Sequence, residues 1–102
     1  MDSEISLEQI VMELVVNSGN ARSLAIEALR AAKEGKPKEA NEIMKEADDV
    51  ILKAHEIQTE LIQKELNGGK VEVSLLMVHA QDHLMNAMTV MDLVKEIIEI
   101  IK

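Results

Sequence analysis

The sequence predicts an all-α fold, namely an antiparallel three-helix bundle in a single domain of residues 1–102. Apolar residues recur at spacings of three and four along three long segments, which is the periodicity of amphipathic helices. The segments are separated by Gly35-Lys36-Pro37 and Asn67-Gly68-Gly69, and glycine and proline are the strongest local signals for turns. Because both connections are short, we expect consecutive helices to pack antiparallel.

The first helix is expected over residues 6–33. Its apolar stripe consists of Ile10, Val11, Leu14, Val15, Ala21, Leu24, Ala25, Ala28 and Leu29. The middle of this segment, Asn17-Ser18-Gly19-Asn20, is a weak helix former, since glycine alone costs roughly 1 kcal/mol relative to alanine in a helix. We therefore predict a kink there, close to a functional surface.

The second helix is expected over residues 37–66 and the third over residues 74–101. Pro37 suits the first position of a helix, where its missing N–H costs no hydrogen bond, and Ser74 is a good N-cap. The seam of the second helix is regular and consists of Ala40, Ile43, Met44, Ala47, Val50, Ile51, Ala54, Leu61 and Ile62. Helices of this size are roughly 40 Å long, so they leave apolar surface to be buried by association.

The composition excludes several classes of function. The chain has no cysteine, which removes disulfides, thiolate zinc sites and thiol nucleophiles. It has no aromatic residue to stack on bases or sugar rings, and its net charge of -8 disfavours binding to nucleic acid or anionic lipid. The acidic start is unlike a signal peptide, and no run approaches the roughly 18 apolar residues of a membrane span. We therefore expect a cytoplasmic protein whose partners are proteins with basic surfaces.

The third predicted helix carries an unusual group of polar residues. On a helical wheel of about 100° per residue, Gln81 falls on the polar, solvent-facing side. The opposite sector is aliphatic in its C-terminal half, with Val90, Leu93, Ile97, Ile100 and Ile101. In its N-terminal half the same sector contains His79, Asp82, His83 and Asn86. We expect this sector to be shielded from water, because aliphatic side chains continue it.

Such a polar cluster needs a compensating function. A polar group withdrawn from water without a partner costs about 1–3 kcal/mol. Residues three and four apart on a helix face one another, so Asp82 and His83 can both lie beside His79 and orient its imidazole. His55 has no such neighbours and is interpreted as an ordinary surface residue. The pattern indicates that His79 is the catalytic residue.

The octapeptide VHAQDHLM at residues 78–85 resembles the active-site segment of the lactose/cellobiose (N,N'-diacetylchitobiose)-type enzyme IIA proteins of the bacterial phosphoenolpyruvate-dependent sugar phosphotransferase system. The resemblance extends over essentially the whole chain, including the first-helix segment Asn17-Ser18-Gly19-Asn20-Ala21-Arg22-Ser23 and the run Val73-Ser74-Leu75-Leu76 before the octapeptide. It implies a spectrin-repeat-like three-helix protomer that assembles as a homotrimer.

The resemblance also implies a function and roles for individual residues. In that family the histidine matching His79 accepts a phosphoryl group from the phosphohistidine of the carrier HPr. It passes this group to a cysteine of the IIB component, which phosphorylates a β-disaccharide of the cellobiose, lactose or chitobiose class during uptake through the membrane component IIC. The aspartate matching Asp82 lies near the trimer axis, where three copies share Mg²⁺ or another divalent cation. We expect His83 to support transfer by hydrogen bonding to the phosphoryl group, whereas Gln81 is a weaker candidate.

Two other interpretations stay open. In the first, the chain is a trimeric helical scaffold in which His79, Asp82 and His83 form only a structural metal site, so that chelation dissolves the assembly and no phosphorylation occurs. In the second, it is a histidine phosphotransfer domain of a two-component system, with a response regulator in place of HPr and IIB. The whole-chain resemblance favours the phosphocarrier over both.

Overall fold

Three α-helices form nearly all of the part of the chain that the computed structural model describes, which is residues 7–101. They are α1 (Leu7–Lys33), α2 (Pro37–Leu66) and α3 (Leu75–Ile101). No strand occurs within the described residues, so the predicted all-α fold is confirmed. The expected helix start at Ser6 and the ends of the expected domain, residues 1–6 and 102, lie outside the described residues.

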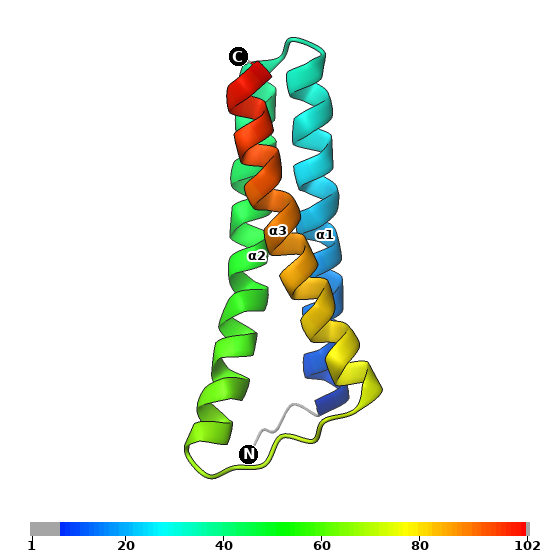
Figure 1. Cartoon of the computed structure of the whole chain (residues 1–102), viewed down its shortest axis with the longest axis vertical. Helices are drawn as coiled ribbons and strands as arrows, with labels where there is room; N and C mark the ends of the chain where they lie inside the picture. The colour runs from blue at the N-terminus through cyan, green and yellow to red at the C-terminus, as the bar shows by residue number, and fades with distance from the viewer. Residues whose placement is uncertain (1–6, 102) are drawn as a thin grey trace.

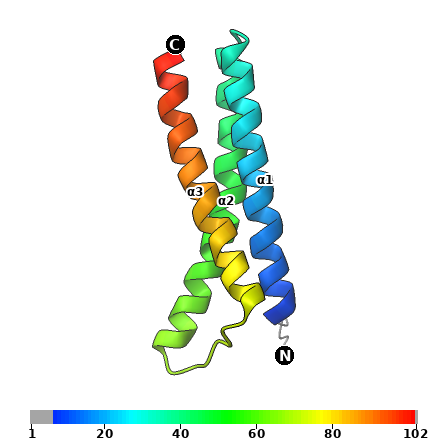
Figure 2. The same cartoon turned by 45° about the vertical axis from the view of Figure 1, so that its right-hand side comes forward.

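The helices form a rod of 49 × 23 × 21 Å. Figure 1 shows that α2 runs opposite to α1 and α3, as predicted, whereas α1 and α3 run in the same direction. In both Figure 1 and Figure 2 the C-terminal end of α2 diverges from the other two helices, and the connection of residues 67–74 crosses this gap. Within the described residues, no helix is long and apolar enough to cross a bilayer.

The turn between α1 and α2 follows from its glycine and proline. Gly35 has φ 79°, a left-handed conformation that most residues avoid. The Lys36 N–H donates a hydrogen bond to the Ala31 carbonyl at 2.9 Å, which closes a Schellman motif at the end of α1. Pro37 then begins α2, and the same pattern of hydrogen bonds ends that helix at Gly68.

Two further predictions concern the N-cap of α3 at Ser74 and the weak helix formers in the middle of α1. Ser74 is the N-cap of α3, because its Oγ accepts a hydrogen bond of 3.1 Å from the Met77 N–H. The sequence predicts a kink at the weak helix formers of residues 17–20, and α1 continues through them without a break in the helix. Leu14 and Ala21 on either side are fully buried, and packing of this kind overrides weak helix propensity.

The core consists of two clusters along the rod. The alanine cluster consists of Ala21, Ala25, Ala28, Ala31, Ala32, Ala40, Met44, Ala47, Met91, Val94 and Ile98. The leucine cluster lies nearer the diverging end and consists of Val11, Leu14, Ala54, Leu61, Met77, Ala80 and Leu84. Helix axes approach more closely where the side chains between them are small. The larger side chains of the leucine cluster therefore suit the end at which the helices separate. Ile62, expected in the seam of α2, is half exposed instead.

Candidate functional site

Helix α3 packs against the other helices through one continuous apolar seam. We call this set the inner seam; it consists of Met77, Ala80, Leu84, Ala87, Met91, Val94 and Ile98, all buried. Its spacings alternate between three and four, so it follows one face of the helix. None of the histidines belongs to it, and the candidate site therefore lies outside the core of the chain.

The sector that we expected to be shielded is exposed in this chain. His83 and Val90 of this sector are half buried, and the other members are exposed. Six of the exposed members, together with Leu75, form a second stripe, the outer stripe, which consists of Leu75, His79, Asp82, Asn86, Leu93, Ile97 and Ile100. Leu93 is 58% exposed and Ile100 is 80% exposed. The expectation that His79 and Asp82 are shielded within the chain is therefore wrong. The physical reason is that α3 has two adjacent apolar faces, and only the inner seam faces α1 and α2.

The two imidazoles are in direct contact. His79 Nε2 and His83 Nε2 are 3.0 Å apart, and the rings meet edge to face with centroids 4.4 Å apart. The spacing of four residues predicts this proximity, because such side chains lie on consecutive turns of the same face. A hydrogen bond between two ring nitrogens requires a proton on one and a lone pair on the other. His79 is exposed, whereas His83 is half buried.

Asp82 is separate from this pair. It is exposed, and within the described residues its carboxylate has no hydrogen bond or ion pair, so the expected contact with His79 is not formed. No group of three or more histidine, cysteine, aspartate or glutamate side chains in the described part of the chain could hold a metal ion. A carboxylate is a suitable ligand for a hard cation, so Asp82 fits a metal site only if other copies of the chain supply further ligands.

Gln81 points to the side of α3 that the wheel predicts, away from the histidine pair, but this side does not face solvent. The sequence predicts that it faces solvent, whereas it is half buried against α2. Gln58 Nε2 donates a hydrogen bond to Gln81 Oε1, and Gln81 Nε2 donates a weak one to Met77 Sδ at 3.8 Å. The prediction was wrong because the wheel does not show that α2 covers this side. Gln81 therefore links two helices and points away from the histidine pair.

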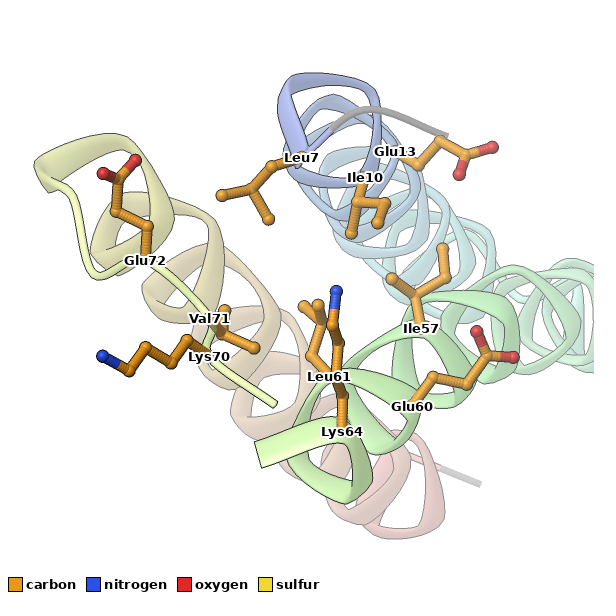
Figure 3. Close-up of a pocket in the computed structure, with 10 residues that line it drawn as sticks. All are labelled: Leu7, Ile10, Glu13, Ile57, Glu60, Leu61, Lys64, Lys70, Val71 and Glu72. Atoms are coloured by element: carbon orange, nitrogen blue, oxygen red, sulfur yellow. The ribbon is translucent and has the colours of Figure 1, made fainter. Parts of the chain in front are cut away.

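A cavity of about 480 Å³ lies elsewhere, at the diverging end of the bundle. Figure 3 shows its apolar wall and, around it, the charged side chains of Glu13, Glu60, Lys70 and Glu72 pointing outward. Its apolar wall is formed by Leu7, Ile10, Ile57, Leu61 and Val71. None of the candidate site residues lines this cavity, so it is not the site of their chemistry.

A three-helix bundle that presents a histidine pair on an exposed face matches the IIA components of the sugar phosphotransferase system. The family model described as PTS system, Lactose/Cellobiose specific IIA subunit, matches residues 9–102. The chain belongs to this family, so the resemblance seen in the sequence is confirmed.

Individual relatives agree with this assignment. The lichenan-specific phosphotransferase enzyme IIA component of Bacillus subtilis (strain 168) is 54% identical over 94 residues, which cover 92% of this chain and 86% of the relative. The structure of the cellobiose-specific enzyme IIA from Bacillus anthracis has a TM-score of 0.90 at 52% identity, covering 99% of this chain and 94% of that one. The IIA(Chitobiose) chain in the Escherichia coli IIA(Chitobiose)–HPr complex has a TM-score of 0.83 at 44% identity, covering 96% and 95%.

Proposed function

We propose that this chain is a cytoplasmic phosphohistidine carrier, which accepts a phosphoryl group from phospho-HPr on His79 and passes it to a cysteine of a IIB component. The transferred group would serve the uptake of a β-disaccharide through a IIC component. The observation that carries the proposal is an exposed imidazole whose Nε2 lies 3.0 Å from the Nε2 of His83. A structural neighbour solved in complex with HPr supports HPr as the donor, and relatives specific for lichenan and N,N'-diacetylchitobiose support a β-linked sugar.

The pair prepares His79 for nucleophilic attack. The proton of the shared hydrogen bond can lie on His83 Nε2. His79 is then the tautomer that is protonated on Nδ1, and its Nε2 has a free lone pair. The neutral nitrogen then attacks phosphorus, and the bond from phosphorus to the donor's imidazole breaks with its electron pair returning to the donor. The His83 N–H, released from His79, donates to a phosphoryl oxygen. His83 is therefore a supporting residue for the transferred group.

The exposure of His79 suits a carrier more than an enzyme acting on a small molecule. Both the donor and the acceptor are protein side chains, so each must reach the same imidazole from solvent. Most of the rate then comes from the positioning of the two partners rather than from groups within this chain. No cavity beside His79 is needed for the sugar, because the sugar meets the phosphoryl group only after it has left this protein.

We further propose that Asp82, Leu93, Ile97 and Ile100 of the outer stripe are buried in a homotrimer, which leaves His79 open to its partner proteins. Leu93 is 58% exposed, Ile97 is 40% exposed and Ile100 is 80% exposed, and neighbouring exposed apolar side chains of this kind mark protein interfaces. Asp82 lies on the same stripe. Three copies of its carboxylate would repel one another at close range, so one Asp82 from each protomer would share a Mg²⁺ ion or another divalent cation, which supplies the neutralising positive charge.

Labelling with a reconstituted donor tests the proposal. The chain is incubated with phosphoenolpyruvate, enzyme I and HPr, and the phosphorylated residue is mapped by mass spectrometry. We expect one phosphoryl group on His79, which is discharged when a cognate IIB component is added. An unlabelled His79, under conditions that label a control IIA protein, would contradict the proposed function.

The scaffold alternative makes a different prediction. If the chain were only a metal-dependent scaffold, chelation would dissolve the assembly and phospho-HPr would not label it. A two-component phosphotransfer domain would instead be labelled by a response regulator and not by HPr. Membership of the lactose/cellobiose-specific IIA family favours the HPr-dependent outcome.

A further inference from the structure

The groove between α1 and α3 fixes which residues of α1 lie beside the histidine pair. Leu76 lines a cavity together with Met12, and Val90 lines another together with Ile26. Because α1 and α3 run in the same direction (Figure 2), the two shared cavities place Leu76 near the height of Met12 and Val90 near the height of Ile26. A residue of α3 therefore lies close to the height of the residue of α1 whose number is lower by about 64.

Gly19 faces His83 in this register. It lies seven residues after Met12 and seven before Ile26, and His83 has the same relation to Leu76 and Val90. Seven residues are about two helical turns, so Gly19 repeats the face of its two neighbours on α1. Gly19 and His83 therefore lie at the same height on facing sides of the groove.

Nothing within the described chain requires glycine at this position. A Cβ at Gly19 would have no neighbouring atom within 4 Å, so packing does not exclude a side chain. Its φ is helical, since the positive φ values belong to Gly35 and Gly68. A glycine inside a helix is less stable than alanine. The packing of the described residues therefore gives no reason for glycine at position 19, and the space beside it is open to a group that approaches from outside the chain.

We propose that Gly19 keeps clear the space into which the phosphoryl group on His79 and its donor must enter. Helical side chains lean toward the helix N-terminus, so His83 leans toward His79 and contacts it. A side chain at Gly19 would lean in the same direction, toward the height of the imidazole pair. The inference rests on the proposed function and names Gly19 as a positioning residue for it.

The geometry of transfer explains why a single methyl group matters. A bond forms from His79 Nε2 to phosphorus while the bond from phosphorus to the donor's imidazole nitrogen breaks and the electron pair returns to that nitrogen. These two nitrogens lie in line, and the three phosphoryl oxygens spread sideways between them. The space required is therefore widest around phosphorus, beside His79 Nε2, and a methyl group introduced by Gly19→Ala on the facing side of the groove would narrow that space.

The test compares the full-length wild-type chain with Gly19→Ala and Gly19→Leu. We expect both variants to be more stable, with a thermal midpoint of Gly19→Ala higher by about 4–8 °C. We expect the maximal rate of phosphoryl transfer from phospho-HPr to fall at least about tenfold in Gly19→Ala and further in Gly19→Leu. The affinity for unphosphorylated HPr and the oligomeric mass should be unchanged.

Asn20→Ala is the matched control, since Asn20 is the adjacent exposed position and points to another side of α1. It should gain stability and transfer phosphoryl groups at the wild-type rate. Wild-type transfer in Gly19→Ala would overturn the proposal. So would a lower thermal midpoint, a changed mass, or an affinity for HPr that falls as much as the rate, because these assign Gly19 to folding, assembly or docking. If the wild-type chain itself were not labelled, the proposed function would fail instead.

Discussion

The two apolar faces of α3 have opposite relations to water. Leu84 on the inner seam is fully buried, whereas Leu93 on the outer stripe is 58% exposed. The inner seam contains no polar residue, while the outer stripe contains His79, Asp82 and Asn86. The inner seam therefore stabilises the fold of a single chain. The outer stripe is left for association and chemistry, and polar groups there cost the folded chain little because they stay hydrated.

The largest effect on phosphoryl transfer is expected from a substitution of His79, and this substitution should leave the stability of the fold nearly unchanged. We expect His79→Ala to abolish labelling by phospho-HPr, because the substitution removes the imidazole nitrogen that we propose as the nucleophile. The same variant should unfold at a urea concentration close to that of the wild type, since His79 is exposed. Labelling of the variant at His83 would place the nucleophile on the other imidazole. A large loss of stability would contradict the division between the two faces.

A matched pair of leucines tests the comparison directly. Leu84→Ala removes a fully buried side chain and should lower the free energy of unfolding by about 2–5 kcal/mol. Leu93→Ala makes the same chemical change on the outer stripe and should have little effect on the fold of a single chain. It should instead weaken the assembly, as measured by sedimentation equilibrium over a range of concentrations. Equal losses of stability from the two substitutions, at concentrations where the chain is monomeric, would refute the distinction.

How much of the molecule was predictable from the sequence depends on which force decides each feature. Local backbone chemistry sets the helix ends, so Pro37, Gly68 and Ser74 lie where their turn and cap preferences predict. The proximity of His79 and His83 follows from helical spacing alone.

Other features depend on tertiary packing, which periodicity does not encode. A wheel finds the apolar positions of α3 but does not decide which of its two faces meets α1 and α2. The wheel likewise places Gln81 in solvent, because it does not show that α2 covers that side of α3. The role that we propose for Gly19 requires the register between α1 and α3. A sequence signal for it exists only in hindsight, as a helical glycine seven residues from both Met12 and Ile26.

A smaller effect, on the stability of the assembly, is expected from a substitution of Asp82 at the proposed trimer axis. Asp82→Leu replaces an exposed carboxylate of the outer stripe by an aliphatic side chain. In a trimer this removes three charges that repel one another, and replacing buried charges by apolar groups is often stabilising. We expect an assembly that no longer requires a divalent cation and melts at least as high as the wild type in the presence of a chelator. Dissociation of the variant would contradict the placement of Asp82 at the axis, while labelling of His79 should persist.

The smallest effect is expected where a polar group is buried among the inward-facing residues of α1. Ser18 is fully buried, and its Oγ has no hydrogen-bond partner among residues 7–101. A hydroxyl withdrawn from water without a partner is destabilising, and alanine is also the better helix former. Ser18→Ala should therefore raise the free energy of unfolding by about 1 kcal/mol in urea denaturation. A loss of stability would show that the Ser18 hydroxyl forms a hydrogen bond in solution. It would also show that the buried faces of the helices accept polar side chains, which the comparison between the inner seam and the outer stripe does not predict.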